Sequence, residues 1–285
     1  DDCSSRGLGD VYKRQNIRSA AWNNLKQDIG VAVGAIILFF IVSIAISSLP
    51  FIGFILQILF TGALYVGYCF FFLKIARNEK AEIEDLFMPF KFKKIIIDSI
   101  IAYLLSGIII AVMFIICFVL WAFVMFGGFE PVGSLIEMFN SFMNSLNQVD
   151  PEVYSYDYNY SIDPQIASFS ASSLFFSFLF IVLLPCAIIS LGISQAYYLL
   201  ADGKPKNGLE AITMSWSLMY NKKIKFLLLQ LSFIGWIILS IFTLFFGFLI
   251  LAPYISSSYA TFYDNLENQK DISVSYTHLT LPTSY

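Results

Sequence analysis

Apolar and charged positions form long separate blocks along this chain. Between Gly30 and Ala260 the charged residues gather in three breaks, and the sequence between those breaks is almost entirely apolar. Roughly 20 apolar residues of helix cross the about 30 Å of hydrocarbon in a bilayer. The pattern therefore predicts an all-α fold, a polytopic transmembrane helical bundle of about six spans with interfacial amphipathic helices. The expected spans are residues 30–49, 51–75, 95–126, 169–201, 224–245 and 247–266.

The charge of each break predicts the orientation of the spans. Two breaks are basic, whereas the third, residues 128–164, carries acidic residues and no Lys or Arg. Because Lys and Arg of short loops stay in the cytoplasm, residues 128–164 are expected to form an outer loop. The expected location is a cytoplasmic (inner) membrane, crossed several times, with the N-terminus in the cytoplasm. The basic residues are Arg77, Lys80, Lys91, Lys93 and Lys94 in one break, and Lys204, Lys206, Lys222, Lys223 and Lys225 in the other.

Several shorter segments are predicted to lie at the membrane surface. Residues 16–28 have the pattern of a short amphipathic helix, and residues 78–94 alternate Phe with Lys around Pro89, which disfavours a continuous helix. Residues 202–205 indicate a turn that leads into a second cytoplasmic interfacial helix. In the outer loop, apolar positions over 135–146 predict a helix on the outer leaflet. The apolar face of the second cytoplasmic helix is Leu209, Ile212, Trp216 and Met219.

The last apolar stretch, residues 226–260, is compatible with two topologies. Two helices that turn near Gly247 would return the C-terminus to the cytoplasm and give six spans. One span followed by an amphipathic tail would give five spans and an outer C-terminus. Within the fourth span, Pro185 is expected to produce a kink.

Both ends of the chain differ in character from the rest. Residues 1–15 and 274–285 resemble translated sequencing-adapter reads, so we exclude both tails from the fold and expect a single transmembrane domain over 16–273. The exclusion removes His278, the only histidine of the chain.

Composition narrows the classes of function. Hydrophobic residues make up 58% of the chain and charged residues 13%, against about 25% charged in an ordinary soluble domain. A net charge of -3 and the lack of a basic stripe outside the loops argue against a nucleic-acid partner. Membrane lipids are the expected partners, with a protein partner or a homo-oligomer left open.

Enzyme signatures are lacking in the sequence. It contains no P-loop, no G-x-S-x-G, no H-E-x-x-H and no histidine between the two tails to act as a general base. We therefore expect no enzymatic activity, no catalytic residue, no cofactor and no metal site. The cysteines inside the apolar blocks are expected to be buried thiols. They are Cys69, Cys117 and Cys186.

A few polar residues lie inside the expected spans. Asp98 is the one ionisable residue near bilayer depth, and an ion pair with Lys94, one helical turn away, is the expectation, with a proton relay as the alternative. Gln57, Gln195 and Gln230 are the candidate substrate-binding residues. Hydrogen bonds between helices, each of order 1 kcal/mol, are the competing use of such side chains.

Four sequence blocks carry a family resemblance. They are AYYLLAD at 196–202, LEAI at 209–212, LSFIGW at 231–236 and APY at 252–254. With these blocks the chain resembles a family of uncharacterised bacterial multi-pass membrane proteins, a domain of unknown function marked by the LSFIGW…PY block. The resemblance implies a helical membrane bundle and nothing about a substrate.

Two functions remain as hypotheses. The first is a membrane-embedded accessory or interaction protein without catalytic activity. The second is a permease for a small solute or lipid, in which Pro185 and Pro253 mark broken helices around a midplane site. A cavity shared by Gln57, Gln195 and Gln230 would distinguish the permease.

Overall fold

The computed structural model describes residues 15–49, 52–125, 176–243 and 246–279. Every regular element in these residues is a helix, which confirms the all-α prediction. The chain divides into two compact units, residues 1–107 with 190–285 and residues 108–189. After an initial helix over 15–25, the elements are α2 (Ile29–Ser47), α3 (Ile52–Ala76), η1 (Ile83–Lys91), α4 (Lys93–Met125), η2 (Leu179–Leu183), α7 (Leu184–Ile193), α8 (Ala196–Ala201), α9 (Gly208–Leu218), α10 (Lys223–Leu231), α11 (Ile234–Phe242) and α12 (Phe248–Leu279).

Five helical segments among the described residues are long and apolar enough to cross a membrane. They correspond to the first five predicted spans, because each apolar block between charged breaks forms helix over most of its length. The charged residues lie at the ends of these segments, where a bilayer would place its interface. The segments are Ile29–Ser47, Ile55–Ala76, Lys93–Phe123, Phe176–Ala201 and Lys223–Phe242.

The sixth predicted span, 247–266, lies within α12, which is not among these five segments. The C-terminal half of α12 contains many polar and charged residues, which lowers its mean hydropathy. The chain turns near Gly247, as expected, and Gly247 N donates to Thr243 Oγ1 at 3.0 Å. A Cβ on Gly247 would lie 2.9 Å from Ser240 Cα, so a larger residue at this turn would force the backbone to shift.

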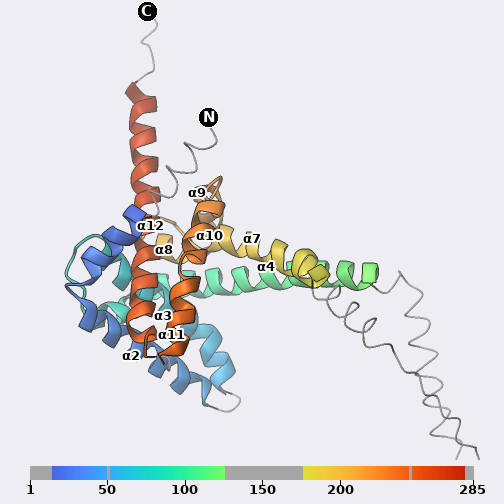
Figure 1. Ribbon diagram of the computed structural model, residues 1–285, viewed down its shortest axis with the longest axis horizontal. Helices are drawn as coiled ribbons and strands as arrows, with labels where there is room; N and C mark the ends of the chain where they lie inside the picture. Colours follow the sequence, from blue (N-terminus) through green and yellow to red (C-terminus); the bar gives the residue numbers. More distant parts are fainter. Residues whose placement is uncertain (1–14, 50–51, 126–175, 244–245, 280–285) are drawn as a thin grey trace, which may run out of the picture. The chain divides into compact units, whose positions relative to one another are not determined.

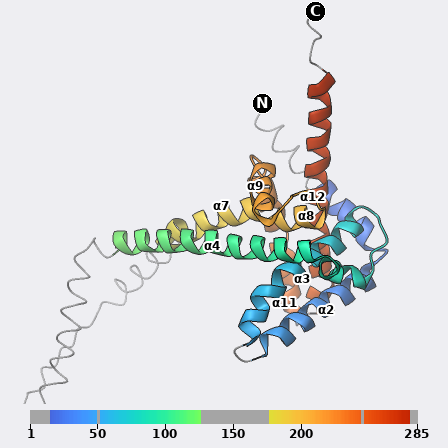
Figure 2. The same ribbon diagram turned by 180° about the vertical axis from the view of Figure 1, so that it is seen from behind.

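Helix α3 is central to the larger unit, where it packs against α2, η1, α8 and α12 (Figures 1 and 2). Two glycines let other backbones approach α3 closely. A Cβ on Gly67 would overlap the carbonyl of Leu86 in η1, and one on Gly62 would lie 2.6 Å from Ser99 O in α4. The side chains of Phe71 and Phe72 fill the interior beside these contacts and are fully buried.

A second group of apolar side chains packs where α10, α12 and the end of α7 meet. Its buried members lie on the inner faces of these helices, and Phe233 connects the break between α10 and α11 to α12. Burial of large apolar side chains of this kind is what a close-packed interior requires. The members are Leu191, Met219, Phe226, Leu229, Phe233, Leu251, Phe262 and Leu266.

Two of the five apolar segments are interrupted. The fourth consists of the π-helix η2, then α7, a turn at 194–195 and α8. Pro185 is the second residue of α7, just after η2, and the wider π turn accommodates the hydrogen bond that a proline cannot make. The fifth breaks at 232–233 between α10 and α11. The break expected at Pro253 is absent, because α12 continues through that residue.

The smaller unit pairs the C-terminal part of α4 with the segment around η2 and α7 in antiparallel fashion. Trp121 joins the two, since its Nε1 donates to Ser177 Oγ at 3.0 Å. Its indole ring also meets the Phe178 ring edge-on at a centroid distance of 5.4 Å. An indole N–H that finds an acceptor can be buried between helices without an unpaired donor.

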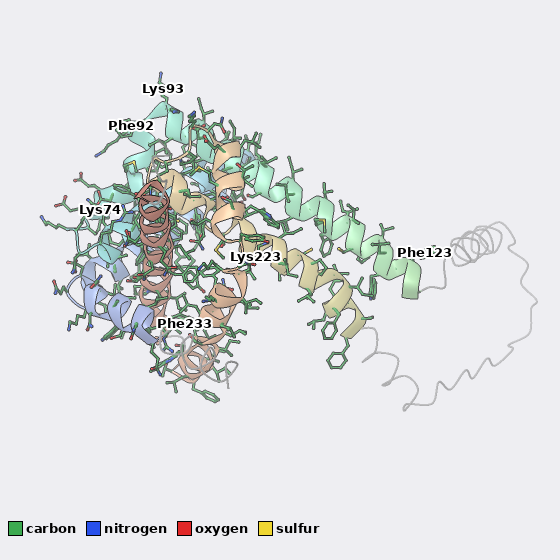
Figure 3. All side chains as sticks on the ribbon, turned by 90° about the horizontal axis from the view of Figure 1, so that it is seen from above. Lys74, Phe92, Lys93, Phe123, Lys223 and Phe233 are labelled. Atoms are coloured by element: carbon green, nitrogen blue, oxygen red, sulfur yellow. The ribbon has the colours of Figure 1, made fainter. Side chains whose placement is uncertain are left out.

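The expected interfacial segments are helical, with some differences in detail. The helix over 15–25 is present with Leu25 buried and Trp22 exposed. Residues 83–91 form a short 3₁₀ helix that contains Pro89, and Phe92 and Lys93 project away from the packed helices beyond it (Figure 3). The expected outer helix over 135–146 lies outside the described residues.

Helix α9 buries a different face from the one predicted. Ile212 and Met219 are buried as expected, but Leu209 and Trp216 are exposed. Small residues of α9 face inward instead, because their size allows other backbones to approach: a Cβ on Gly208 would overlap Asp98 O of α4. The small residues are Gly208, Ala211 and Ser215.

Candidate functional site

The three candidate glutamines occupy three different environments. Gln57 is exposed on α3, and Gln195 is fully buried at the turn between α7 and α8. Gln230 is half-buried on α10 and shares a hydrogen bond with Tyr259 of α12. None of them is among the residues that line the two cavities described below.

Gln195 organises the break in the fourth segment. Its backbone N–H donates to Ser215 Oγ of α9 at 3.1 Å, and that hydroxyl donates to Gly192 O at 2.8 Å. Its side-chain Nε2 donates to Ser194 Oγ at 3.0 Å. The amide oxygen Oε1 is buried without a hydrogen-bond partner in the structure. A buried acceptor without a partner costs about 1–3 kcal/mol, which makes Gln195 unusual among the described residues.

The ion pair expected between Lys94 and Asp98 does not form. Lys94 is exposed, whereas Asp98 is buried on the side of α4 that faces Gly208. Among the described residues, neither Lys94 nor Asp98 takes part in an ion pair. Asp98 is buried where α9 closely approaches α4. The i, i+4 spacing of Lys94 and Asp98 could not predict that approach.

Five charged side chains from segments far apart in the sequence form an ion-pair cluster. Arg77, just after α3, contacts Asp202 Oδ1 with Nη1 at 2.7 Å and Asp264 Oδ1 with Nε at 2.8 Å. Lys204 Nζ lies 3.2 Å from Asp202 Oδ2 and 2.7 Å from Glu267 Oε1. The cluster therefore joins the end of α3, the turn between α8 and α9, and α12.

A turn and a tyrosine position Asp202 within the ion-pair cluster. Gly203 has a φ of +67°, a left-handed conformation that glycine adopts freely, and it folds Asp202 and Lys204 toward each other. From α12, the hydroxyl of Tyr263 donates to Asp202 Oδ2 at 3.1 Å. Asp202 thus accepts hydrogen bonds on both carboxylate oxygens.

Electrostatics keep the ion-pair cluster charged. Burial alone would raise the pKa of Asp202, but the hydrogen bond from Arg77 and the nearby charge of Lys204 hold that pKa below its ordinary value. Burial acts to lower the pKa of Lys204, and its bonds to Glu267 and Asp202 reverse the effect and raise it. The bond to Asp202 raises the pKa of Arg77 as well. Each member stabilises the charged form of its neighbours.

A second polar contact fixes η1 against α3. Lys74 Nζ donates to Asp85 Oδ2 at 2.8 Å, and the same oxygen accepts from Glu82 N as part of a capping box. Lys80 and Glu82 form a pair that is largely exposed. The pair of Lys74 and Asp85 is therefore more shielded from solvent than the pair of Lys80 and Glu82.

Ion pairing limits the chemistry available to the carboxylates of the ion-pair cluster. The carboxylates of Asp202 and Asp264 are engaged by Arg77, and Glu267 is engaged by Lys204. Across the described part of the chain, no three His, Cys, Asp or Glu side chains are placed to hold a metal ion. Within the same residues the free thiols of Cys69 and Cys117 are buried as expected, whereas that of Cys186 is only half-buried.

Two cavities adjoin the helix over 15–25. The first cavity, of about 360 Å³, lies between that helix, α10 and α12, and it combines lysine and amide groups with apolar side chains. The second cavity, of about 430 Å³, lies between the same helix, α11 and α12, and is almost wholly apolar. Trp22, Trp236 and Tyr254 are the aromatic residues of the second cavity.

The chain was compared with known protein families. Residues 11–270 match the model of a family described as a protein of unknown function, DUF975. The chain belongs to this family. The match includes the ion-pair cluster, both cavities and all four blocks on which the sequence resemblance rests, so it confirms the resemblance to an uncharacterised family.

No curated protein and no solved structure matches this DUF975 chain. Sequence reasoning did not identify the ion-pair cluster of this DUF975 protein as a site. The signal that could have indicated it is the recurrence of opposite charges at the ends of separate apolar blocks: Arg77 after one block, Asp202 and Lys204 after another, and Asp264 and Glu267 in α12.

Proposed function

We propose that this protein is a non-enzymatic accessory or interaction protein embedded in the bacterial cytoplasmic membrane, with its N-terminus in the cytoplasm. The observation that carries the proposal is the apolar surface that its helices leave uncovered. Of an 18-residue apolar stretch within the segment Lys223–Phe242, only 22% is buried within the chain. Along α11, Trp236 is 50% exposed and Phe242 is 80% exposed.

The uncovered face of α11 fits a helix of a partner protein or of a second copy. Large apolar side chains in lipid gain nothing from hydrophobic burial, but their shape allows close packing against another helix. The ion-pair cluster supports the same role, because it fixes α3 and α12 on the basic side and keeps such a surface in one arrangement. Lysine-bearing loops support the cytoplasmic orientation of that side.

In-cell photocrosslinking tests the accessory role. A benzoylphenylalanine at Phe242 or Trp236 of α11 is expected to give a discrete protein adduct in intact cells. The same probe at Phe233, which is 1% exposed, is the matched control and is expected to give only intramolecular products. Lipid adducts alone from both exposed positions would contradict an interaction surface on α11.

Purified protein tests the non-enzymatic assignment. After reconstitution in liposomes, the protein is expected to leave phospholipids intact, since the carboxylates of the ion-pair cluster are engaged by Arg77 and Lys204. Release of fatty acid or of phosphorylated headgroup, lost in an Asp202→Asn variant, would show catalysis and would overturn the proposal.

The permease is kept as a second candidate because two apolar segments are broken. Discontinuous helices often surround substrate sites in transporters, and the break at 194–195 contains the unpartnered Oε1 of Gln195. A liposome swelling assay with small polar solutes distinguishes the candidates. The accessory role predicts no solute flux above that of empty liposomes. Flux that a Gln195→Leu variant abolishes would favour the permease and contradict the accessory role.

A further inference from the structure

The second cavity lies between α11, α12 and the helix over 15–25, and its walls are apolar. Helices α11 and α12 pack side by side next to it (Figure 1). Its volume of about 430 Å³ is in the range of small-molecule sites. An apolar ligand is therefore the kind of molecule that its walls would contact. The large side chains of the lining are Trp22, Trp236, Leu239, Ile250, Leu251 and Tyr254.

Two hydroxyl groups also line the second cavity, and both are used within the chain. Ser240 Oγ donates to Trp236 O at 2.8 Å, and Thr243 Oγ1 donates to Ser240 O at 2.9 Å. Thr243 Oγ1 also accepts a hydrogen bond from Gly247 N. An apolar cavity offers water few hydrogen bonds and takes up apolar ligands instead. A hydrocarbon chain is therefore complementary to this lining.

Arg18 places a cation one helical turn from the second cavity. It precedes Trp22 by four residues, so both side chains lie on one face of the helix. Its Nε donates to the hydroxyl of Tyr254 at 3.2 Å. Its guanidinium carbon lies 5.1 Å from the centroid of the Phe233 ring and 5.8 Å from that of Tyr254. The guanidinium is thus held against two aromatic rings, beside residues that line the cavity.

The surroundings of Arg18 are unusual for a charged residue. Phe233 lies near the middle of the candidate span Lys223–Phe242, so Arg18 lies beside apolar sequence and not beside its charged end. Arg18 is half-buried, and among the described residues it takes part in no ion pair. A charged side chain at bilayer depth is costly to hold there and marks a candidate functional site.

The guanidinium of Arg18 retains donors for an anion. Within the described part of the chain, Nε is its one nitrogen that donates a hydrogen bond. A guanidinium carries five N–H donors in a planar fork, so those of the two Nη atoms remain. Such a fork binds a carboxylate through two parallel hydrogen bonds. A ligand with a carboxylate at one end and an apolar chain at the other matches both Arg18 and the cavity.

Two of the sequence blocks behind the family resemblance meet at this place. Phe233 and Trp236 belong to the LSFIGW block, and Tyr254 belongs to the APY block. The rings of Phe233 and Tyr254 meet edge-on at a centroid distance of 5.3 Å. Trp22 meets Tyr254 in the same way at 5.5 Å. These aromatic contacts fix the helix over 15–25, and with it Arg18, against α11 and α12.

We propose that Arg18 and the second cavity form a binding site for a long-chain fatty acid, with the carboxylate at the guanidinium and the alkyl chain in the cavity. The site offers one cation and one apolar cavity, which matches a molecule with one charge and one chain better than a phospholipid with two chains. The proposal rests on the membrane location given under Proposed function and names a ligand for the same protein.

Equilibrium binding of radiolabelled palmitate to the full chain in a neutral detergent tests the site. We expect saturable binding of one palmitate per chain. Unlabelled hexadecanol has the same alkyl chain without the carboxylate, and we expect it to compete roughly tenfold more weakly than unlabelled palmitate. Equal competition by the two compounds would show that the carboxylate is not recognised and would overturn the proposal.

Arg18→Gln removes the cation and leaves the cavity in place. We expect it to weaken palmitate binding roughly tenfold and to change hexadecanol binding less than about twofold. The matched control is Lys26→Gln, which removes one exposed charge just after the same helix and outside the lining. We expect it to change palmitate binding less than about twofold. Equal losses in the two variants would show attraction to net charge alone and would overturn the site.

Two tryptophan substitutions on α11 probe the cavity without changing any charge. Leu239 lines the cavity and is 54% exposed, whereas its neighbour Ile238 is 50% exposed and lies outside the lining. Leu239→Trp fills apolar volume, so we expect it to weaken binding of palmitate and of hexadecanol roughly tenfold each. Ile238→Trp is expected to change neither by more than about twofold. Equal effects of the two substitutions would place the alkyl chain elsewhere and contradict the proposal.

Two further competitors separate a fatty acid from other anions. Acetate at millimolar concentration is expected not to displace palmitate, because it lacks the alkyl chain. Phosphatidylglycerol is expected to compete more weakly than palmitate, because its second chain has no cavity. Displacement by acetate would assign Arg18 to a small soluble anion, and stronger competition by phosphatidylglycerol would assign the cavity to a phospholipid. Either result would overturn the proposal.

Failure of the fatty-acid site is distinguishable from failure of the proposed function. A protein that does not bind palmitate but still gives a discrete protein adduct from the probe at Phe242 would overturn the site alone. A chain that stays in the soluble fraction of a detergent-free lysate would overturn the membrane location on which both proposals rest.

Discussion

Asp202 accepts contacts from Arg77, Lys204 and Tyr263, so the ion-pair cluster depends on this residue more than on any other of its members. Asp202→Asn keeps the shape and removes the charge. We expect unfolding in detergent to require about 1–2 kcal/mol less free energy, because the half-exposed partners retain Asp264 and Glu267. Denaturant titration followed by circular dichroism measures the loss.

The exposed pair of Lys80 and Glu82 supplies the control for Asp202→Asn. Its side chains are largely in solvent, and such pairs contribute little to stability. Lys80→Met removes the pair and leaves the capping box of η1 in place. We expect its unfolding midpoint to equal that of the wild type. Equal losses for Lys80→Met and Asp202→Asn would show that the ion-pair cluster has no special role.

The pH dependence of stability follows from the same residues. The pKa of Asp202 is below its ordinary value, so its contribution is present above the unfolded pKa of about 3.9 and is lost as pH falls through the folded value. The pKa of Lys204 is raised, so its contribution is present below about pH 10.4 and is lost as pH rises through the folded value. The stability gap between wild type and Asp202→Asn should therefore be constant near neutral pH and narrow below about pH 4. A gap that widens with acid would contradict this assignment.

Among the elements, the contact between α3 and η1 depends on a missing side chain. A Cβ on Gly67 would overlap the carbonyl of Leu86, and backbone cannot move aside as a flexible side chain can. Gly67→Ala is expected to destabilise the protein by about 2 kcal/mol or more.

Gly107 supplies the control. In α4, Gly107 has nothing within 4 Å of the position of a Cβ. Gly107→Ala is expected to be neutral or to stabilise by up to about 1 kcal/mol. Thermal unfolding of both variants checks this, and equal effects would contradict the close contact.

The sequence was informative about elements where one physical cause dominates. Blocks of apolar residues predicted α2, α3 and α4 to within a few residues, because helices in lipid must satisfy their backbone hydrogen bonds internally. The breaks at 194–195 and 232–233 were not foreseen, since neither contains a proline. They occur where Ser215 bonds to Gln195 and where Phe233 packs against α12, and such contacts arise only after folding.

For the whole molecule, long-range polar contacts limited what could be predicted. Arg77 meets residues 125 and 187 positions later in the sequence, and no local pattern encodes such pairing. The candidate glutamines failed as a set for the same reason: composition reveals polar residues in apolar blocks, but helix rotation decides whether each is exposed, as Gln57 is, or buried, as Gln195 is.

The central claim is that the apolar helices cross a bilayer and hold the lysine-bearing turns on the cytoplasmic side. Alkaline phosphatase and fluorescent-protein fusions after Gly128 and after Lys204 test it most directly. The account predicts phosphatase activity only at Gly128 and fluorescence only at Lys204. The same compartment for both positions, or a chain that stays in the soluble fraction of a detergent-free lysate, would contradict it.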